Sequence, residues 1–463
     1  MLFRFPYIVL LIIAVAAFSI RAYNLFYNST FVDEAFYVVI GQQILNGEFS
    51  KVAGAISWVG AFPFFYPFFS GLFYSLGGIV ATRLFNVELG TISVILMFVF
   101  ARSLKLFPDK FANNVTGLVA AAIMATAAVP IQLSRLAIYD MLSFTIFLLG
   151  LIFYVWALQK KDRWFYLAAA ITIFLAFLAK YIVLIYIPLF IVSGWFMDEK
   201  SRKNFTFYFS IPLFLMTALY GIINLPKLIE YFSSQVGDPT TTYSDVISVF
   251  WQFSLPLTLF AGISALLLWK SKKETIKALL FMGLFPVFVH TVTKNNTSSE
   301  QHVFLVLTFL LPLVGAFFAY IFTKNKLLGI LVTSVFVLLN LAYSYPIVRD
   351  AESFWPDSTE AAEVIKNNVA GDDIILAEGS DTIYLGLGGA IPISQVIGPF
   401  VFDYQGLEGR DAYLKAIDDR YFKLVEIEKV YFSTQDIQAI EAKLAENYTI
   451  IFDDGKIRVY SRN

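Results

Sequence analysis

The chain has 463 residues, of which 58% are hydrophobic and only 15% are charged, and its mean hydropathy is +0.70. This composition is typical of a protein with many membrane-spanning helices and excludes a chain that is soluble and globular throughout. Cysteine is absent, which excludes disulfides and thiolate metal sites. The two histidines, His290 and His302, are too few for a multi-histidine metal site.

Charge is distributed unevenly along the sequence. The net charge is −1, yet 21 acidic and 10 basic residues follow Arg349. The first 349 residues therefore carry a net positive charge, which lysines in cytoplasmic loops explain without a nucleic-acid partner. We predict two domains, a membrane domain over 1–348 and an acidic domain over 349–463.

The apolar runs predict the membrane spans, because a helix needs about 20 apolar residues to cross a bilayer. The first run lacks a cleavage site of small residues, so we interpret it as an uncleaved helix rather than a signal peptide. Twelve stretches are candidates: 6–26, 61–80, 86–104, 113–131, 140–158, 164–179, 181–196, 205–225, 247–269, 277–293, 303–322 and 327–346.

Basic loops predict the orientation of these spans. Lysines and arginines recur after every second span, at 102–110, 160–163, 200–203, 270–277 and 324–326, which predicts that these loops are cytoplasmic. The loop that carries Asp33 and the acidic tail are then extracytoplasmic. Only an odd number of crossings can join the Asp33 loop to 102–110, and 61–80 is interrupted by prolines and glycines. We therefore predict that 61–80 is re-entrant or interfacial and that about 11 helices cross.

The acidic tail is predicted to be a small α/β domain. Helical patterns cover 356–369, 410–421 and 434–446. Strands are expected at 374–377, 429–432, 449–452 and 457–460, with Asp453-Asp454-Gly455 as the hairpin turn between the last two.

Asp33 and Glu34 are the most informative residues of the membrane domain. Two adjacent carboxylates close to hydrocarbon are rare unless they face water, a partner or a substrate. A structural alternative stays open, because carboxylates are also favoured at the start of a helix, here an amphipathic, interfacial helix over 34–46.

Further ionisable residues are expected near the same extracytoplasmic face. Arg135 and Asp140 form either an ion pair or parts of a site, and Asp140 alternatively caps the span that it opens. Lys180 lies between two spans and either extends to the interface or binds an anion. His302, like His290, is either a hydrogen-bonded structural residue or part of a site. The ionisable residues that the topology gathers near this face are Asp33, Glu34, Arg83, Arg135, Asp140, Lys180 and His302.

These residue types suit a reaction on a lipid-delivered substrate. The sequence contains no glycine-rich phosphate loop, nucleotide fingerprint or metal-ligand set. A lipid phosphate that leaves as an anion needs a cation nearby, for which Arg83, Arg135 and Lys180 are candidates. An acceptor hydroxyl needs a carboxylate that takes its proton, and Asp33 suits this task.

The order of these motifs resembles the polytopic glycosyltransferases of the GT-C superfamily, in the branch of protein O-mannosyltransferases and the lipid A aminoarabinose transferase. The resemblance spans roughly residues 6–346. Its motifs are Val32-Asp33-Glu34-Ala35-Phe36-Tyr37, Phe62-Pro63-Phe64-Phe65-Tyr66-Pro67, Arg83-Leu84, Ser134-Arg135-Leu136-Ala137 with Asp140, and Leu178-Ala179-Lys180. In relatives a lysine often precedes a Pro-Pro pair in the second motif, whereas this chain has Ala61-Phe62-Pro63.

The resemblance implies transfer of a sugar from a polyprenyl- or dolichyl-phosphate, with inversion, at an extracytoplasmic site. Asp33 is then the catalytic carboxylate, Glu34 supports it and Asp140 is the second acidic residue. Arg83, Arg135, Lys180 and His302 are the candidates for binding the donor phosphate or the acceptor. No cofactor is required by the motifs, and a divalent cation, with Asp33 and Asp140 as its candidate ligands, stays open.

The acceptor is a protein, a lipid or a glycan, and membrane lipids are the other expected partners. Two alternatives from other classes remain. A transporter or flippase would place ionisable groups at the bilayer midplane and repeat its halves, and neither pattern is found. A noncatalytic membrane scaffold would leave Asp33, Asp140 and Lys180 unconverged.

Overall fold

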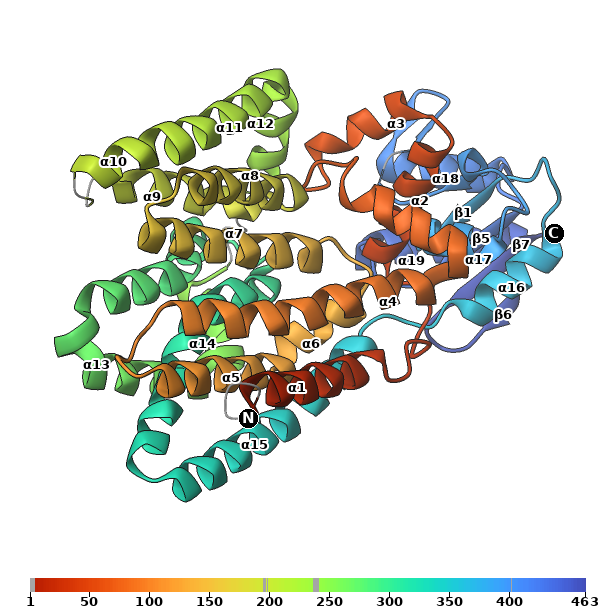
Figure 1. Cartoon of the computed structure of the whole chain (residues 1–463). Coiled ribbons are helices and arrows are strands. Elements are labelled where there is room, and N and C mark those ends of the chain that lie inside the picture. Colours follow the sequence, from red (N-terminus) through yellow and green to blue (C-terminus); the bar gives the residue numbers. More distant parts are fainter. Residues whose placement is uncertain (1–4, 195–196, 198, 236–240, 401) are drawn as a thin grey trace. The chain divides into compact units, whose positions relative to one another are not determined.

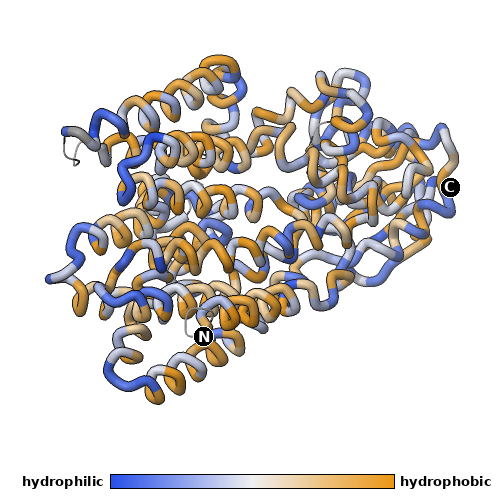
Figure 2. Tube along the Cα trace, viewed as in Figure 1, coloured by the Kyte–Doolittle hydropathy of each residue, from blue (hydrophilic) through white to orange (hydrophobic). Residues whose placement is uncertain are grey.

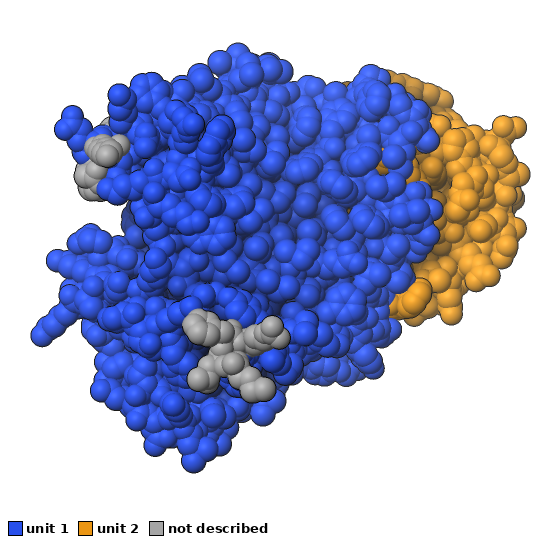
Figure 3. All heavy atoms as spheres, in the orientation of Figure 1, with its two compact units in different colours: residues 1–25, 43–351 blue, residues 26–42, 352–463 orange. Residues whose placement is uncertain are grey.

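The computed structural model describes residues 5–194, 197, 199–235, 241–400 and 402–463 (Figure 1). The chain divides into two compact units, coloured separately in Figure 3. One comprises Met1–Leu25 and Gln43–Ala351 and is called the helical unit below. The other comprises Phe26–Gln42 and Glu352–Asn463 and is called the tail unit. The segment 26–42, which carries Asp33 and Glu34, thus groups with the C-terminal residues.

The helical unit is built from apolar helices joined by polar turns, as the hydropathy colours of Figure 2 show. Its central helix is α14 (Ser299–Lys324), which packs against α13 and α5. Gly315 permits this closeness, because a Cβ atom there would lie 2.3 Å from the Thr116 carbonyl oxygen of α5. The other elements are α1 (Phe5–Ala22), α3 (Phe49–Gly54), η1 (Ala55–Ser57), α4 (Tyr66–Ser103), α5 (Lys110–Thr126), α6 (Ala128–Arg135), α7 (Asp140–Lys160), α8 (Arg163–Ala179), η2 (Tyr181–Ile185), α9 (Tyr186–Ser193), α10 (Glu199–Phe205), the π-turn η4 (Thr206–Ser210), α11 (Ile211–Ile223), α12 (Leu225–Ser234), α13 (Tyr243–Thr293) and α15 (Lys326–Glu352).

Seven helices among the described residues are long and apolar enough to cross a membrane, or up to eight if the bent pair α5–α6 is one span. The predicted count of about 11 is therefore not confirmed by length and composition. Part of the difference is that α13 counts once, although non-helical torsion angles at Lys272 divide it into the two predicted stretches 247–269 and 277–293. The helices α8 and α9 are apolar but shorter.

The stretch 61–80 was predicted to be re-entrant or interfacial, with 86–104 as the crossing helix, and the membrane placement of 61–80 stays a prediction. Residues from Tyr66 onward form the first arm of α4, which continues into the second arm across a break at Gly77 and Gly78. Gly78 has φ +64°, a backbone conformation that glycine adopts without steric cost. Pro67 lies in the first turn of α4, and the break that separates its two arms is at the two glycines.

The tail unit contains a five-stranded sheet of order β2-β1-β5-β7-β6. β1 is parallel to β2 and β5, whereas β5, β7 and β6 are antiparallel neighbours. Two clusters of buried apolar side chains, around Ile375 and Leu376, which point to opposite faces of β1, form its core. The elements are α2 (Val32–Leu45, which extends past the unit boundary), α16 (Thr359–Asn368), β1 (Ile375–Ala377), α17 (Ser380–Leu387), η5 (Ile393–Gln395), β2 (Val396–Ile397), β3 (Asp403–Tyr404), β4 (Leu407–Glu408), α18 (Gly409–Asp418), β5 (Leu424–Ile427), α19 (Thr434–Asn447), β6 (Tyr448–Asp453) and β7 (Arg458–Arg462).

Most predicted elements of the tail are confirmed, including its three helices, the first strand and the last hairpin. The strand predicted at 429–432 is wrong: the strand is β5, and 429–432 forms a loop. The cause is Glu378, whose carboxylate accepts hydrogen bonds from five consecutive backbone N–H groups, those of residues 428–432, at 2.5 to 2.9 Å. A loop wrapped around one carboxylate cannot offer the same N–H groups to a neighbouring strand.

Replacing Glu378 with glutamine is expected to loosen this loop. The glutamine amide has one acceptor oxygen and an NH₂ group that cannot accept, so at least two buried N–H groups lose their partner. The expected loss is about 3 kcal/mol of local stability. Hydrogen exchange of the full-length protein should then be faster over 428–432 than in the wild type, whereas Glu408→Gln at an exposed site should change nothing. Equal exchange in the Glu378 variant and the wild type would contradict this role.

Two further carboxyl groups lie beside Glu378. Burial, and then the charge of Glu428, raise the pKa of Glu426 well above its ordinary value. Burial, and then the charge of Glu378, raise the pKa of Glu428 to about 7. In the unfolded chain both groups ionise near their usual value of 4.5, so their contribution to the stability of the tail unit is complete below about pH 4.5. The contribution of Glu428 is lost as the pH rises through about 7, and that of Glu426 is lost as the pH rises through its own raised pKa.

The tail unit is therefore expected to be less stable at pH 8 than at pH 5. Hydrogen exchange at β1 and β5, corrected for its intrinsic pH dependence, should report more frequent opening at the higher pH. Glu428→Gln should remove part of this dependence, because an amide does not ionise. Protection that is the same at both pH values would show that neither carboxyl group titrates in this range.

Candidate functional site

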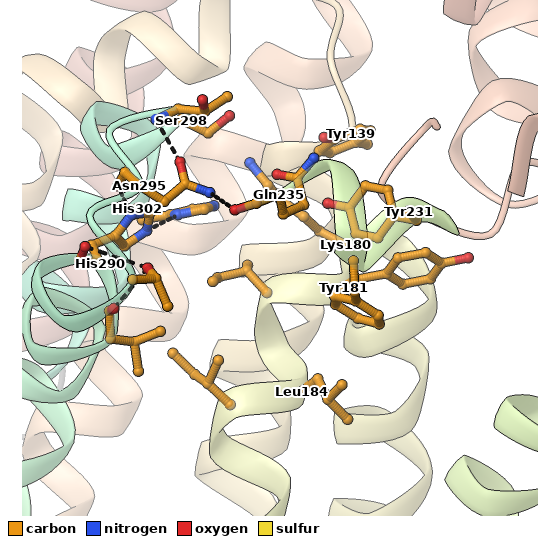
Figure 4. A pocket seen from close by; sticks show the side chains of 16 residues that line it. Tyr139, Lys180, Tyr181, Leu184, Tyr231, Gln235, His290, Asn295, Ser298 and His302 are labelled. Atoms are coloured by element: carbon orange, nitrogen blue, oxygen red, sulfur yellow. Dashed lines mark hydrogen bonds between the residues drawn. The ribbon is translucent and has the colours of Figure 1, made fainter. Parts of the chain in front are cut away.

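A cavity of about 440 Å³ lies in the helical unit (Figure 4). Its walls come from η2, α12, the end of α13, the loop that follows α13 and the start of α14. One part of the lining is apolar, with Ile182, Leu184, Ile185, Phe232 and Val289. Its polar and tyrosine side chains are Tyr139, Lys180, Tyr181, Tyr231, Gln235, His290, Thr293, Asn295, Thr297, Ser298 and His302. The cavity thus suits a molecule that has an apolar part and a polar head.

Lys180 and Asp140 form a buried ion pair at this cavity. Their side chains are 4% and 2% exposed. The Lys180 ammonium group donates to Asp140 Oδ1 and to Gln301 Oε1, the latter at 2.7 Å. It also lies 5.0 Å from the centre of the Tyr139 ring. Because Lys180 lines the cavity, this arrangement holds a positive charge at a fixed place in its wall.

The local backbone explains how the pair forms. Asp140 is the first residue of α7, where a carboxylate is favoured, and Lys180 follows the last residue of α8 in an extended conformation. The next residue, Tyr181, donates its backbone N–H to the Gly60 carbonyl oxygen at 2.8 Å. Two of the three structural alternatives for these residues are corrected: Asp140 pairs with Lys180 rather than Arg135, and the Lys180 side chain is buried rather than extended to the interface.

The two histidines of the chain form a second polar pair. His290 Nε2 and His302 Nδ1 are 2.7 Å apart, and His290 Nδ1 is 2.7 Å from the Asn295 carbonyl oxygen. Both side chains are buried. From the sequence, each histidine was interpreted singly, and their pairing was not predicted. Its signal was that they flank a short polar loop between two apolar stretches, which brings the stretch ends together.

Arg83 and Arg135 donate hydrogen bonds to backbone carbonyl oxygens at the end of α1 and just after it. Arg135 donates to the carbonyl oxygens of Arg21 at 2.9 Å and of Tyr23 at 2.6 Å, and Arg83 donates to that of Leu25 at 2.8 Å. These carbonyls belong to the end of α1 and the residues after it, where the helix leaves acceptors unsatisfied and the dipole is negative. The two guanidinium groups therefore fix the chain where it leaves α1.

Asp33 and Glu34 lie in the first turn of α2, within the tail unit. Glu34 is buried, and its Oε2 accepts the backbone N–H of Phe31 at 2.9 Å, so the helix-capping alternative is confirmed for Glu34. Asp33 is half-buried. Asn28, upstream in the same segment, donates from its amide group to the carbonyl oxygens of Glu352 and Trp355, both at 3.0 Å.

The predicted site residues thus fall into three groups. The structure brings Lys180 and His302 to the lining of one cavity, with Asp140 and Gln301 as partners of the lysine. It places Arg83 and Arg135 at the end of α1 and Asp33 and Glu34 in the tail unit. Among the described residues, no three histidine, aspartate or glutamate side chains are grouped so as to hold a metal ion.

No protein-family model matches the chain, and no curated protein matches it in sequence. Its structure, however, is similar to solved membrane proteins along nearly its whole length. The ArnT of Cupriavidus metallidurans in the apo state aligns with a TM-score of 0.63 at 13% identity, over 99% of this chain and 97% of that one. The same protein bound to undecaprenyl phosphate aligns with a TM-score of 0.60 at 12% identity, over the same shares of both chains.

The archaeal oligosaccharyltransferase AglB of Archaeoglobus fulgidus, in complex with an inhibitory peptide and a dolichol-phosphate, is also similar. It aligns with a TM-score of 0.56 at 14% identity, over 99% of this chain and 74% of that one. ArnT and AglB belong to the GT-C superfamily, so the chain has the GT-C fold. The predicted resemblance is confirmed at the level of the fold.

Proposed function

We propose that this GT-C-fold chain is a membrane glycosyltransferase that moves a sugar from a polyprenyl- or dolichyl-phosphate to an acceptor hydroxyl, with inversion. The observation that carries the proposal is the buried Lys180 ammonium group in the wall of a partly apolar cavity. Burying a cation of this kind costs free energy. That cost is offset where an anion binds to the cation or where negative charge develops beside it.

A lipid phosphate fits both sides of the cavity. The volume of the cavity lies within the roughly 300–1,000 Å³ that small-ligand sites occupy. The apolar wall around Ile182 and Val289 would hold the first isoprene units, and Lys180 would meet the phosphate. Two proteins of the same fold bind such lipids, undecaprenyl phosphate in one and dolichol-phosphate in the other, which supports the proposal.

The reaction is a single displacement. Asp33 takes the proton of the acceptor hydroxyl as the oxygen attacks the anomeric carbon of the sugar. The bond from that carbon to the phosphate oxygen breaks, its electron pair goes to the oxygen, and Lys180 stabilises the new charge. Attack from the side opposite the phosphate inverts the anomeric carbon. Asp140 positions the lysine, and Glu34 fixes the start of the helix that carries Asp33.

The task of binding phosphate is assigned to Lys180 rather than to Arg83 and Arg135, because the contacts of those two residues stabilise the end of α1. His302 also lines the cavity, but the phosphate is not assigned to it. A divalent cation is not needed for this scheme, because Lys180 already supplies a positive charge.

The proposal includes a topology. If α8, η2–α9 and each arm of α13 cross the bilayer, and α4 crosses once, the chain has eleven crossings. Asp33 then follows one crossing and the acidic domain over 349–463 follows eleven, so an odd number precedes each. Both would therefore lie on the extracytoplasmic face, on the side opposite the basic loops.

The test is sugar transfer by the purified chain in lipid nanodiscs. Polyprenyl-phosphate hexoses and pentoses with a radiolabelled sugar would be offered one at a time, with membrane lipids and peptides as acceptors. We expect at least one of them to lose its sugar to an acceptor. Mass spectrometry of glycans and lipids from cells with and without the chain would then identify the acceptor. If no sugar lipid is consumed and cells without the chain have unchanged glycans and lipids, the proposed function is wrong.

A further inference from the structure

The two histidines form a hydrogen-bonded chain that has one direction only. The Asn295 carbonyl oxygen can only accept, so His290 Nδ1 must carry a proton and donate to it. In a neutral His290 the other nitrogen, Nε2, is then an acceptor. His302 Nδ1 lies 2.7 Å from it and must therefore donate. It follows that Nε2 of a neutral His302 has a lone pair and no proton.

This last nitrogen is the one without a partner. His302 is 6% exposed, and its Nε2 has no hydrogen-bond partner among the described residues. A buried polar atom of this kind costs about 1–3 kcal/mol unless a donor reaches it. His302 lines the cavity, and Figure 4 shows it beside His290 at the same end as Asn295. The nitrogen itself has almost no exposed surface, so a ligand in the cavity reaches this unsatisfied acceptor once a neighbouring lining side chain moves aside.

We propose that His302 Nε2 accepts a hydrogen bond from a hydroxyl group of the sugar that the lipid phosphate carries. This inference rests on the proposed function and specifies which part of the donor each cavity residue meets. A phosphate oxygen is itself only an acceptor and would repel the lone pair, so His302 does not bind the phosphate. Lys180, which donates to Gln301 beside His302, meets the phosphate instead. Lys180 thus binds the phosphate of the donor's head group, and His302 binds its sugar.

His290 is a positioning residue in this arrangement. Its own hydrogen bond to the Asn295 carbonyl sets the proton positions of both rings. Without His290, the His302 ring could carry its proton on Nε2 and present a donor to the cavity. The loop after α13 thereby determines which kind of group the cavity accepts.

The proton positions can be measured directly, because the chain has only two histidines. Nitrogen-15 NMR of the full-length protein with labelled histidine should give two neutral rings, each with its proton on Nδ1. In His290→Phe the remaining ring should lose this fixed preference. A wild-type His302 that carries its proton on Nε2, or that is doubly protonated at neutral pH, would overturn the inference.

Binding of two lipids tests the partner of Nε2. An asparagine at position 302 can still donate to His290 but has no atom where Nε2 lies. His302→Asn should therefore bind a polyprenyl-phosphate sugar roughly tenfold more weakly, the value of one hydrogen bond, and bind bare polyprenyl phosphate as the wild type does. His302→Gln, whose longer side chain returns an acceptor to the cavity, should recover part of the loss. Thr291→Val is the matched control, because Thr291 does not line the cavity and its hydroxyl already donates to the Val287 carbonyl oxygen within α13.

The outcomes separate this inference from the proposed function. If His302→Asn binds both lipids as the wild type does, or weakens both equally, the sugar contact is wrong and Nε2 binds only water. If the wild type binds the sugar lipid and transfers its sugar, and the variants at position 302 do so equally well, only the inference is overturned. A wild type that binds neither lipid would overturn the proposed function itself.

Discussion

Replacing Lys180 with methionine is expected to abolish sugar transfer and to destabilise the helical unit by about 3–5 kcal/mol. The change leaves the Asp140 carboxylate buried with its cation removed, and an unpaired buried charge costs that much. It also removes the charge that stabilises the departing phosphate. Thermal unfolding of the purified protein and turnover of a polyprenyl-phosphate sugar measure the two effects.

A double variant separates stability from catalysis. Adding Asp140→Asn to Lys180→Met removes the unpaired charge, so thermal stability should return towards that of the wild type while transfer stays absent. The matched control is Lys277→Met, which breaks an exposed ion pair with Glu274 and should cost less than about 1 kcal/mol. A double variant that transfers sugar at the rate of the wild type would show that Lys180 has only a structural role.

Replacing Asp33 with asparagine is expected to lower turnover by roughly 10²- to 10⁴-fold, the usual contribution of a general base. The amide has nearly the shape of the carboxylate but cannot take the proton of the acceptor hydroxyl. Binding of the donor lipid should stay within about twofold of the wild type, because the phosphate and the sugar are held by residues of the helical unit. Single-turnover assays and lipid titrations on the same preparation measure the two quantities.

The control for this variant is Asp372→Asn, which changes an exposed carboxylate in the tail unit. It should leave turnover unchanged. If Asp33→Asn and Asp372→Asn have the same turnover, Asp33 is not the base and its role is confined to the first turn of α2.

The sequence predicted those parts of the molecule that depend on local pattern. Apolar runs located the helices, and alternation and turn residues located the first strand and the last hairpin of the tail. Where a contact between distant residues overrides the local pattern, the prediction was wrong. Residues 429–432 have strand-like side chains, but Glu378, about fifty residues earlier, engages their backbone N–H groups and holds them in a loop.

The site was predictable in its residues but not in its pairings. Asp140 and Lys180 were both candidates, yet they are 40 residues apart, and no local pattern indicates that they meet. The histidine pair was missed because its geometry depends on how the loop at Asn295 turns. Arg83 and Arg135 were candidate phosphate ligands, and the structure shows that each also donates to backbone carbonyls near the end of α1, contacts that sequence patterns do not reveal.

The grouping of residues 26–42 with the C-terminal residues has a consequence for biosynthesis. The segment that bears Asp33 leaves the ribosome early, but its partners Glu352, Trp355 and Thr382 are translated more than 300 residues later. A nascent or truncated polypeptide that ends before these residues therefore has Asp33, the proposed base, in a segment that lacks its contacts with the C-terminal residues. A chain that stops before Glu352 would leave Asn28 and Thr30 without these partners, whereas one that extends past Thr382 would contain all of them.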